Sequence, residues 1–308
     1  MARVLVTGGA GFIGSNLVRA LLERGDEVRV LDNFSTGNRS NLEGVGVEIV
    51  EGELRSYERV HNAVRRAEVV YHLGALGSVP RSVQDPLTSS AVNVEGTLNV
   101  LLAARDEGVR RVVFSSSTSV YGSSRSLPTT EDVPPDPISP YGVAKLAAER
   151  YCISFSRVYD SFESVVLRYF NVYGPRQSPF SQYAAVVPLF VTAIAAGNPV
   201  TIHGDGEQSR DFTYVSNVVD ATILAGETDG ASGEIFNIAA GAPASVNRLA
   251  DTIGTLLGTP VQKEHLPSRP GDIRDSWADL SKAERLLGYR PGVDLDEGLR
   301  RTVEHLIG

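Results

Sequence analysis

The chain has 308 residues, of which 42% are apolar and 21% charged, and a formal net charge of −8 at pH 7. This composition is that of a folded globular protein and excludes a disordered tail, a collagen-like fibre and a coiled coil. The acidic balance gives no support for nucleic-acid binding, and no apolar run approaches the ~20 residues that a membrane span needs.

Strand and helix patterns alternate through the first half of the chain. Short apolar runs rich in β-branched residues predict strands, and apolar residues that recur every three or four positions predict helices. The predicted strands are Arg3–Thr7, Glu27–Leu31, Val47–Val50, Val69–Leu73, Arg111–Ser115 and Glu163–Tyr169. The predicted helices are Phe12–Arg24, Ser56–Arg66, Val92–Glu107 and Ser139–Tyr159. This alternation indicates an α/β protein with a doubly wound parallel sheet that helices cover on both faces.

The second half is less regular, because proline and glycine interrupt it repeatedly. We expect strands at Asp211–Val215 and Ile235–Ile238, and helices at Ser245–Leu257 and Ser281–Leu287. No low-complexity linker separates the halves, so the second lobe is expected to be threaded through the first. The predicted boundaries are 1–171 plus 211–241 for the main domain and 172–210 plus 242–308 for the smaller lobe.

Two features bear on where the protein resides. The single cysteine, Cys152, cannot form an internal disulfide. The chain also begins directly with a predicted strand rather than with a signal peptide. Both features predict a protein of the reducing cytoplasm.

A glycine-rich turn joins the first predicted strand to the first predicted helix. Gly8, Gly11 and Gly14 permit a tight turn, close approach of the backbone to a pyrophosphate, and close contact between helix and strand. The N-terminus of the helix adds N–H donors and positive potential. Asp32 ends the second strand, 18 residues after Gly14, where a carboxylate binds ribose hydroxyls and repels the 2′-phosphate of NADP. The pattern predicts an NAD site; the alternative is a structural turn followed by a surface aspartate.

Tyr141 and Lys145 lie one helical turn apart. Ser139 and Pro140 are a typical N-cap and first-turn residue, so the pair lies near the start of its helix. Residues at i and i+4 share a face, and an ammonium group is expected to lower the pKa of a nearby phenol. Such a tyrosine takes a proton from a sugar hydroxyl near neutral pH. Lysine itself is informative here, because the chain has only two other lysines among its 29 basic residues.

A run of hydroxyl side chains, Ser115–Ser119, follows the fifth predicted strand. Ligands collect at the carboxyl ends of the strands of a parallel sheet, so a hydroxyl there is placed to bind a substrate oxygen. Ser116 and Ser119 are instead expected to stabilise their own loop.

These motifs together resemble the NAD-dependent nucleotide-sugar epimerase/dehydratase family of extended short-chain dehydrogenases/reductases. The resemblance covers nearly the whole chain and includes the glycine spacing G-x-x-G-x-x-G. The segments that carry it are Thr7–Gly14, Asp32–Asn33, His72–Ala75, Asn93–Thr97, Ser115–Gly122, Tyr141–Lys145, Leu167–Gly174, Gly204–Gly206, Arg210–Phe212 and Arg269–Asp272. The resemblance implies a Rossmann-type NAD-binding domain with a smaller, interleaved C-terminal lobe that binds a nucleotide sugar.

The resemblance also implies roles for individual residues. Ser117 and Tyr141 would face the sugar 4-hydroxyl, and Lys145 would hold the nicotinamide ribose. The implied NAD contacts are Gly8, Gly11, Phe12, Ile13, Gly14, Asp32, Asn33, Ser35, Thr36, Gly37, Glu53, Leu54, Leu73, Gly74, Ala75, Asn93, Ser115, Tyr141, Lys145 and Tyr169. The implied UDP-sugar contacts are Ser117, Tyr141, Asn171, Val186, Val187, Thr201, Arg210, Arg269, Asp272 and Ser276. Arg210 and Arg269 would clamp the phosphates, and no metal is expected.

The residues after the active-site serine favour one reaction within this family. Dehydratases carry Asp-Glu there and decarboxylases carry a Glu, whereas this chain has Thr118 and Ser119. The resemblance therefore implies a UDP-hexose 4-epimerase, an isomerase that works through a transient 4-keto sugar. The alternatives are a dehydratase or decarboxylase, a UDP-glucuronate 4-epimerase using Arg81 or Arg176 for the sugar carboxylate, and a catalytically silent dinucleotide-sensing protein.

The resemblance leads to two further expectations. Ser276 matches a position beside the sugar 2-substituent, where a small residue accompanies acceptance of N-acetylated sugars. We therefore expect UDP-GlcNAc and UDP-GalNAc to be accepted as well as UDP-Glc and UDP-Gal. A homodimer is also expected, in which Val92–Glu107 and Ser139–Tyr159 pack as a four-helix bundle.

Overall fold

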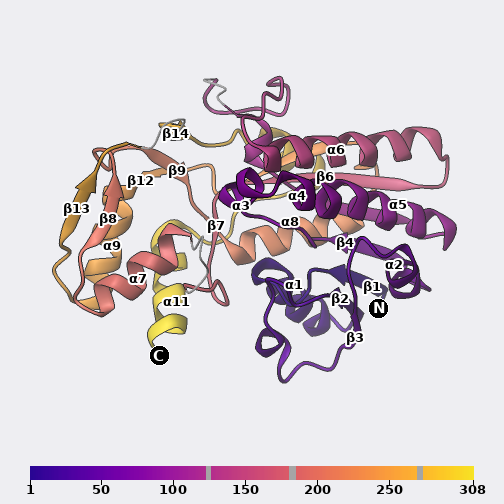
Figure 1. Ribbon diagram of the computed structural model, residues 1–308, viewed down its shortest axis with the longest axis horizontal. Coiled ribbons are helices and arrows are strands. Elements are labelled where there is room, and N and C mark those ends of the chain that lie inside the picture. Colours follow the sequence, from indigo (N-terminus) through magenta and orange to yellow (C-terminus); the bar gives the residue numbers. More distant parts are fainter. Residues whose placement is uncertain (123–125, 180–184, 269–272) are drawn as a thin grey trace.

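The computed structural model describes residues 1–122, 126–179, 185–268 and 273–308. Its centre is a sheet of seven parallel strands (Figure 1). In spatial order the strands are β11 (Ile235–Ile238), β6 (Glu163–Tyr169), β5 (Arg111–Ser117), β4 (Val69–His72), β1 (Arg3–Thr7), β2 (Glu27–Asp32) and β3 (Glu48–Glu51). Chain order reverses between β1 and β4, which confirms the predicted doubly wound, Rossmann-type sheet and leaves a crevice at the carboxyl ends of these strands.

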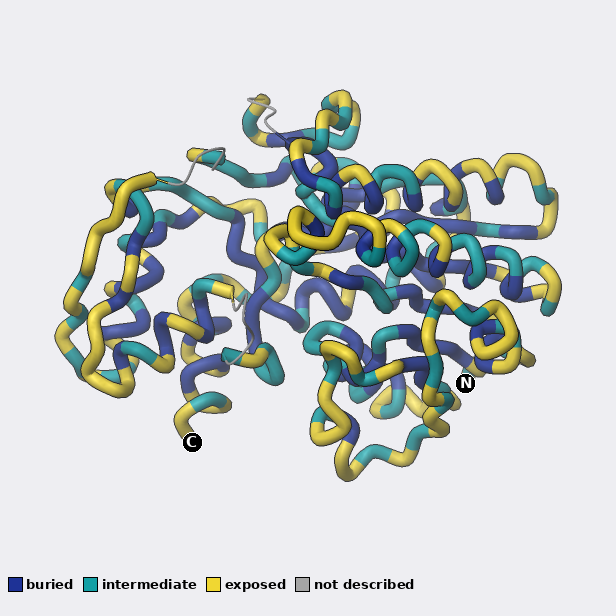
Figure 2. The backbone as a smooth tube through the Cα atoms, in the orientation of Figure 1, coloured by how far each residue is buried: buried dark blue, intermediate teal, exposed yellow. Residues whose placement is uncertain are grey.

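Helices cover both faces of the sheet because its strands are apolar on both sides. In β1, Val4 and Val6 belong to one buried cluster and Leu5 belongs to another on the opposite face. The first cluster packs against α1 (Phe12–Glu23) and α8 (Val215–Glu227). The second packs against α2 (Tyr57–Val64), α5 (Gly96–Asp106) and α6 (Pro140–Val158). In Figure 2 the strands and the inner sides of these helices are buried, as a sheet covered on both faces requires.

The predicted helix Val92–Glu107 forms part of a longer helical run. Asp85 caps α4 (Pro86–Ser90) by accepting from the Thr88 backbone N–H at 3.0 Å. A single π turn, Ala91–Glu95, joins α4 to α5. A further short helix, α3 (Val79–Gln84), precedes α4. The π turn accommodates one extra residue per turn, and such turns occur often beside functional sites.

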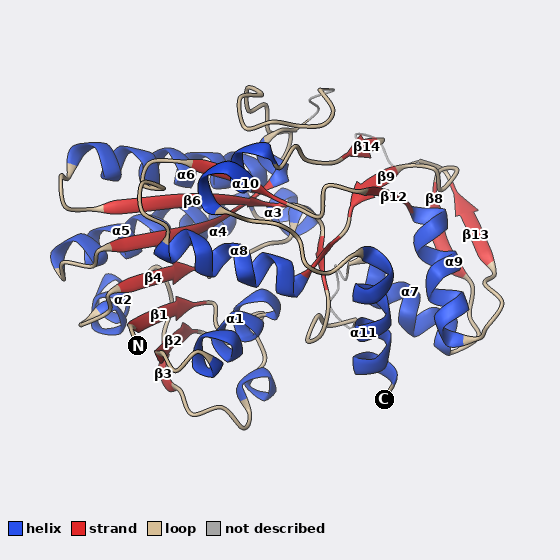
Figure 3. Ribbon diagram, turned by 180° about the vertical axis from the view of Figure 1, so that it is seen from behind, coloured by secondary structure: helices blue, strands red, loops and turns tan. Residues whose placement is uncertain are grey.

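A second, smaller part of the chain lies beside the sheet (Figure 3). Its elements are β7 (Val172–Tyr173), α7 (Val186–Ala195), β8 (Val200–His203), β9 (Ser209–Asp211), β10 (Thr213–Tyr214), β12 (Pro243–Ser245), α9 (Val246–Leu257), β13 (Lys263–Leu266), β14 (Asp275–Ser276) and α11 (Leu295–Ile307). β13 pairs with β8, and β9 lies between β12 and β14. We call this part the lobe.

The chain leaves the sheet for the lobe and then returns to it. It runs from β6 into β7, α7, β8 and β9, and comes back through α8 to β11 at the sheet edge. It then enters the lobe again through β12 and α9, and α10 (Ser281–Leu287) packs against β11 and α8. This path is threaded, as expected, although the boundaries 1–171 plus 211–241 and 172–210 plus 242–308 stay a prediction.

The predicted strand Asp211–Val215 is wrong in part. β9 ends at Asp211, only Thr213 and Tyr214 form a further short strand, and Val215 begins α8. Helix α8 is buried over most of its surface, so its sequence lacks the one-sided apolar spacing that identifies a helix. Within the described ranges, no helix combines the length and the apolar character that crossing a bilayer requires.

Candidate active site

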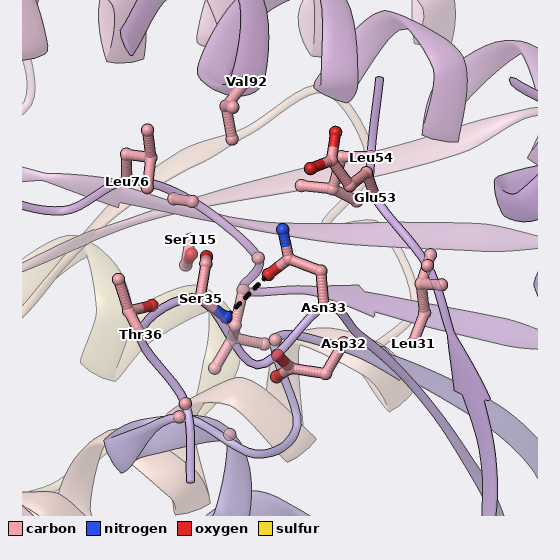
Figure 4. Close-up of a pocket in the computed structure, with 18 of the residues that line it drawn as sticks. Leu31, Asp32, Asn33, Ser35, Thr36, Glu53, Leu54, Leu76, Val92 and Ser115 are labelled. Atoms are coloured by element: carbon pink, nitrogen blue, oxygen red, sulfur yellow. Dashed lines mark hydrogen bonds between the residues drawn. The ribbon is translucent and has the colours of Figure 1, made fainter. Parts of the chain in front are cut away.

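A cavity of about 310 Å³ opens at the carboxyl ends of β1, β2, β4 and β5 (Figure 4). Of the residues predicted to contact the cofactor, those that line it are Gly8, Gly11, Phe12, Ile13, Gly14, Asp32, Asn33, Ser35, Thr36, Gly37, Glu53, Leu54, Leu73, Gly74, Ala75 and Ser115. The sequence did not identify seven others, namely Leu31, Gly52, Arg55, Leu76, Arg81, Thr88 and Val92. Arg81 and Thr88 lie on α3 and α4, whose shortness gives no periodic signal.

The glycine turn fits a phosphate group. Gly8 has φ +70°, and a Cβ atom added to it would lie 2.7 Å from the Gly74 backbone nitrogen. A Cβ atom on Gly14 would lie 2.1 Å from the Gly8 carbonyl oxygen. Gly11 is the N-cap of α1 and no side chain caps that helix, so the N–H groups of its first turn face the cavity without a side-chain partner. An uncapped helix N-terminus with no side chains in front of it is a ready anion site.

Asp32 closes the far side of the turn. Its Oδ2 accepts from the Ala10 backbone N–H at 2.9 Å, and its Oδ1 accepts from the Phe34 backbone N–H at 2.8 Å. A carboxylate has about four acceptor positions, so each oxygen retains capacity for a ribose hydroxyl. The carboxylate lines the cavity beside Asn33, whose Oδ1 accepts from the Ser35 backbone N–H at 3.1 Å (Figure 4). These positions fit the adenine ribose of NAD and oppose the extra phosphate of NADP.

Asn93 supports the cavity wall from behind. Its Oδ1 accepts from the Leu76 backbone N–H at 2.9 Å, and its Nδ2 donates to the Leu76 carbonyl at 3.1 Å. Leu76 lines the cavity, whereas Asn93 does not. The predicted contact between Asn93 and the cofactor therefore stays a prediction, and the observed role is to fix the loop after β4.

His72 lies beneath the same loop in a neutral state. Its Nδ1 lies 2.7 Å from the Thr7 hydroxyl, and its Nε2 lies 3.0 Å from the Thr97 hydroxyl. The Thr97 hydroxyl donates to the Asn93 carbonyl at 2.7 Å, so it accepts from Nε2–H. Burial lowers the pKa of His72 to about 3. The neutral imidazole on β4 therefore links β1 to the first turn of α5.

Tyr141 and Lys145 share the buried face of α6, as predicted. Ser139 caps the helix by accepting from the Gly142 backbone N–H at 3.1 Å. The Lys145 Nζ donates to the Ser115 carbonyl at 2.8 Å and lies 4.7 Å from the Phe114 ring centroid. It lies 6.0 Å from the Tyr141 ring centroid. Because Ser115 lines the cavity, this hydrogen bond holds the ammonium group at the cavity wall.

The expected direction of the tyrosine pKa is wrong for the protein alone. Burial raises the pKa of Tyr141 to about 12, and the hydrogen bond with the Ser117 hydroxyl only partly opposes this rise. Burial also lowers the pKa of Lys145 to about 8. Removing both groups from water disfavours the phenolate and the ammonium alike, and at this separation desolvation outweighs their mutual attraction.

The serines at the end of β5 have different partners, and Ser116 does not bond its own loop, contrary to expectation. Ser117 donates to the Ser119 hydroxyl at 3.1 Å and hydrogen-bonds Tyr141. Ser116 points to the other side of β5 and donates to Oε1 of the buried Glu149 at 2.5 Å. Ser117 is therefore the serine at the tyrosine, and Ser116 has a structural partner.

A second cavity of about 450 Å³ lies in the lobe. Of the residues predicted to contact the substrate, Asn171, Val186, Val187, Thr201 and Arg210 line it. The sequence did not identify ten others, namely Val172, Tyr173, Ala185, Leu189, Phe190, Ile202, His203, Gln208, Phe212 and Val246. Most are apolar residues of β7, α7 and β8, for which the sequence analysis proposed no element.

The remaining predicted substrate residues lie in three places. Ser276 on β14 pairs in parallel register with Arg210 on β9, and Arg210 lines the lobe cavity whereas Ser276 does not. Arg269 and Asp272 lie outside the described residues. Ser117, Tyr141, Lys145 and Tyr169 line neither cavity, and the Tyr169 hydroxyl lies 2.7 Å from that of Thr222.

The two arginines considered for a sugar carboxylate differ in position. Arg81 lines the first cavity beside Thr88 and Val92. Arg176 follows β7 and donates to Oδ1 of Asn16 on α1. Among the described residues, no group of three or more His, Cys, Asp or Glu side chains is arranged to hold a metal ion.

Known proteins resemble this chain in sequence and in structure over almost its full length. The sequence model of the NAD dependent epimerase/dehydratase family matches residues 4–239. UDP-glucose 4-epimerase from Mycolicibacterium smegmatis is 42% identical over 312 residues, which cover 98% of this chain and 97% of that protein. The crystal structure of UDP-glucose 4-epimerase from Thermotoga maritima with UDP-glucose is 41% identical, with a TM-score of 0.94 and coverage of 98% of both chains.

A third relative differs in its sugar. The structure of UDP-N-acetylglucosamine 4-epimerase from Methanobrevibacter ruminantium, in complex with UDP-N-acetylmuramic acid, is 39% identical. It has a TM-score of 0.94 and covers 99% of this chain and 98% of its own. These matches confirm the family that the motifs predicted: the chain belongs to the NAD-dependent epimerase/dehydratase family.

Proposed function

We propose that this protein interconverts the C4 epimers of a UDP-hexose with NAD as its cofactor. The observation that carries the proposal is the Tyr141–Lys145 face of α6. Its Lys145 donates to the carbonyl of Ser115, which lines a cavity that fits a dinucleotide. Thr118 and Ser119 stand where an elimination needs acids. Relatives that share 39–42% of the sequence carry 4-epimerase names and support the same reaction.

NAD would occupy the first cavity. Its pyrophosphate would lie over the glycine turn at the N-terminus of α1, and its adenine ribose would lie against Asp32. The nicotinamide end would then reach Ser115 and Lys145. On this basis residues 1–171 and 211–241 form the NAD-binding domain.

The nucleotide sugar would occupy the lobe cavity, formed by residues 172–210 and 242–308 with Asn171 at its rim. Arg210 supplies a guanidinium on the cavity wall, and this group suits a diphosphate. Arg269 and Asp272 are proposed as further contacts to the phosphates and the ribose. The apolar wall formed by Val186, Val187 and its neighbours would enclose the uracil and ribose.

The proposed reaction combines a hydride transfer at C4 of the sugar with a proton transfer at its 4-hydroxyl. When bound, NAD supplies a cationic ring that removes a hydride from the sugar carbon and later returns it. Tyr141 would take the proton of the 4-hydroxyl, and would give it back to the oxygen of the 4-keto sugar when hydride returns to the opposite face of C4. Lys145 would stabilise the phenolate by its charge, and Ser117 would do so by turning its hydroxyl from Ser119 to donate to the phenolate oxygen.

Two related reactions are less well supported. A dehydratase or decarboxylase needs a carboxylic acid beside the active-site serine, whereas Thr118 and Ser119 carry only hydroxyls. UDP-glucuronate 4-epimerisation needs a cation at the sugar carboxylate. Arg81 lines the NAD cavity instead, and Arg176 is engaged by Asn16. A catalytically silent protein would not need both Tyr141 and Lys145.

The choice of sugar is the finer part of the proposal. Ser276 is small and pairs with Arg210, which lines the lobe cavity, and a small side chain at this position would leave room for an N-acetyl group. We therefore expect turnover of UDP-GlcNAc and UDP-GalNAc as well as UDP-Glc and UDP-Gal.

The test is to incubate the purified protein with UDP-Glc, UDP-GlcNAc and UDP-GlcA separately, without added NAD, and to resolve the products by NMR. The expected products are UDP-Gal and UDP-GalNAc, formed without added cofactor because NAD is regenerated in each cycle. A 4-keto-6-deoxy product would contradict the epimerase, and turnover of UDP-GlcA alone would replace the proposed substrate.

A homodimer is proposed through the helices α5 and α6. The run from α4 to α5 and the helix α6 carry exposed apolar side chains, among them Leu87, which is 83% exposed, and Val158, which is 66% exposed. Replacement of both residues by Glu should shift the protein from dimer to monomer in sedimentation analysis. A wild-type monomer at micromolar concentration would contradict the proposal.

A further inference from the structure

One amide side chain joins the helix at the NAD cavity to the lobe. Asn16 lies on α1, four residues after Phe12, which lines that cavity. Its Nδ2 donates to the Phe12 carbonyl at 2.8 Å and to the Pro175 carbonyl at 3.1 Å. Its Oδ1 accepts from the Arg176 guanidinium at 2.5 Å. Both ends of the amide are therefore engaged by the two residues that follow β7 and Gly174.

The same segment is tied to the wall of the lobe cavity. Gln177 follows Arg176 and donates from Nε2 to the Val172 carbonyl at 3.2 Å. Its backbone N–H donates to the Gly174 carbonyl at 3.3 Å, which closes the turn. Val172 lines the lobe cavity. A continuous series of hydrogen bonds and peptide bonds thus connects the wall of one cavity to the wall of the other.

Arg176 occupies a conformation that needs an outside constraint. Its φ is +69°, in the left-handed region of backbone conformation. Residues other than glycine are uncommon there, and their surroundings hold them in it. Its Nε is buried and has no hydrogen-bond partner among the described residues. Within that part of the chain no carboxylate forms an ion pair with it. The Asn16 amide accepts from the NH2 group of this guanidinium.

The charges that face Arg176 do not explain its position. Burial and the nearby cation of Arg19 lower the pKa of Arg176, while Tyr214 and Glu23 act weakly in the opposite direction. His305 on α11 also faces it, and burial together with the Arg176 charge lowers the pKa of that imidazole. A half-buried cation beside another cation is unfavourable by itself, so electrostatic attraction does not explain why Arg176 lies here. Its hydrogen bond to Asn16 at the junction of the two parts does explain its position.

We propose that Asn16 and Arg176 are positioning residues that couple the NAD cavity to the lobe cavity, so that NAD and the nucleotide sugar bind cooperatively. A ligand that orders the glycine turn fixes the first turn of α1, and the Asn16–Arg176 contact fixes β7 against it. The nucleotide sugar then binds a lobe cavity whose β7 wall is already ordered, and it loses less conformational entropy on binding. The inference rests on the proposed function, since it takes the lobe cavity as the UDP site.

The test compares UDP affinity, measured by calorimetry, between cofactor-free and NAD-loaded protein. Wild-type protein should bind UDP about tenfold more tightly when loaded, within the usual range of coupling between sites. Asn16→Ala and Arg176→Ala should each bring this ratio close to one. Asn16→Asp keeps the acceptor for Arg176 and should restore most of the ratio.

Arg19→Ala is the matched control: Arg19 lies one turn further along α1 and donates to the Asn41 and Glu43 carbonyls, and its charge disfavours the neighbouring Arg176 cation, so its removal should leave the Asn16–Arg176 contact in place. It should keep the tenfold ratio. An unchanged ratio in Asn16→Ala would overturn the coupling, and so would a loss of the ratio in Arg19→Ala that equals the loss in Asn16→Ala.

A second measurement does not depend on UDP. Addition of NAD should slow amide hydrogen exchange in residues 172–177 of the wild type, and should leave these amides unchanged in Asn16→Ala. Equal protection in both proteins would overturn the inference. Failure of the wild type to bind UDP would contradict the proposed function instead, and the exchange measurement would still decide the coupling.

Discussion

Glu149 of α6 and Arg168 of β6 form a fully buried ion pair one helical turn after Lys145. Nε and NH2 of Arg168 donate to the two carboxylate oxygens at 2.9 and 2.8 Å. The side chains are 0% and 1% exposed, respectively. Ser116 adds a third hydrogen bond to the carboxylate, and the guanidinium lies 4.6 Å from the Tyr121 ring centroid. The pair fixes α6, and with it Tyr141 and Lys145, against the sheet.

Replacing one partner of this pair should be strongly destabilising. Glu149→Gln leaves the Arg168 charge buried without a counter-ion, and such changes cost about 3–5 kcal/mol in the free energy of unfolding. Urea denaturation at pH 7 measures the loss. Glu297→Gln is the control, because it breaks exposed ion pairs on α11 and should leave the midpoint nearly unchanged. Equal midpoints for Glu149→Gln and the wild type would contradict this interpretation.

Tyr141→Phe should abolish proton transfer while leaving the fold and ligand binding intact. The ring stays buried and only the hydroxyl that bonds Ser117 is lost. We expect kcat to fall by about 10²–10⁴, the usual contribution of a general base, with KM changed by less than about twofold. Tyr289→Phe removes a buried hydroxyl outside the site and should keep wild-type kcat. A Tyr141→Phe variant with more than a tenth of wild-type kcat would exclude the proposed base.

Lys145 predicts a dependence of stability on pH. Burial lowers its pKa to about 8, whereas the unfolded chain keeps the proton to about pH 10.4. Between these values the unfolded state binds more protons, so this group makes the ligand-free protein more stable as pH rises from 8 towards 10. Lys145→Met should remove that rise and raise stability at pH 7 by roughly 2 kcal/mol: about 2.4 pKa units at about 1.4 kcal/mol each, less about 1 kcal/mol for the lost hydrogen bond to the Ser115 carbonyl.

Activity gives the complementary test of Lys145. Lys145→Met and Lys145→Arg should both lose most turnover while staying folded, because the wider guanidinium does not fit between Phe114 and the Ser115 carbonyl. Denaturation curves at pH 7, 8 and 9 on wild type and Lys145→Met decide the stability claim. Parallel pH dependence in the two proteins would show that another group is responsible.

Gly14→Ala should disrupt the cofactor site by steric overlap. The added methyl group would lie 2.1 Å from the Gly8 carbonyl oxygen and 2.9 Å from the Gly9 Cα, so the turn must move. We expect NAD affinity to fall at least about tenfold, and stability to fall by about 1–3 kcal/mol. Gly46→Ala adds the same methyl group where nothing lies within 4 Å, and should change neither quantity. Fluorescence titration with NAD distinguishes the variants.

Ser276→Tyr should narrow the range of sugars. A large ring beside Arg210 would fill the space that we assign to the N-acetyl group. We expect kcat/KM for UDP-GlcNAc to fall at least about tenfold and that for UDP-Glc to change by less than threefold. If the variant converts both sugars at wild-type rates, Ser276 does not face the 2-substituent.

The sheet could be predicted closely because each of its strands is short, apolar and followed by turn residues. Arg3–Thr7, Glu163–Tyr169 and Ile235–Ile238 have the predicted boundaries, and the other four strands differ by one or two residues at their ends. The same reasoning missed α7 and α8. Both are apolar on nearly every side, and α7 carries Pro188 in its first turn. Helix α11 was missed despite a clear signal, the Asp294 cap followed by Glu297.

Site residues next to strands of the sheet could be predicted from the sequence, and most of those on the missed elements could not. Residues next to strand ends, such as Asp32 and Ser115, line the NAD cavity because strand ends in a parallel sheet converge. Other lining residues lie on the short helices α3 and α4 or in the lobe. None of these is next to a predicted strand of the sheet, so the sequence offered no basis for placing them. The pKa of Tyr141 was predicted with the wrong sign because a sequence gives the spacing of two charges and not their exposure to water.

The return of β11 to the sheet edge constrains both synthesis and redesign. Tyr141, Lys145 and the glycine turn all leave the ribosome before residue 235, yet the edge of the sheet beside β6 stays unpaired until that strand appears. During that interval β6 is an open edge to which other chains can pair. Exchanging lobes between relatives to change the sugar would likewise require two segments, on either side of α8 and β11, to be transplanted together.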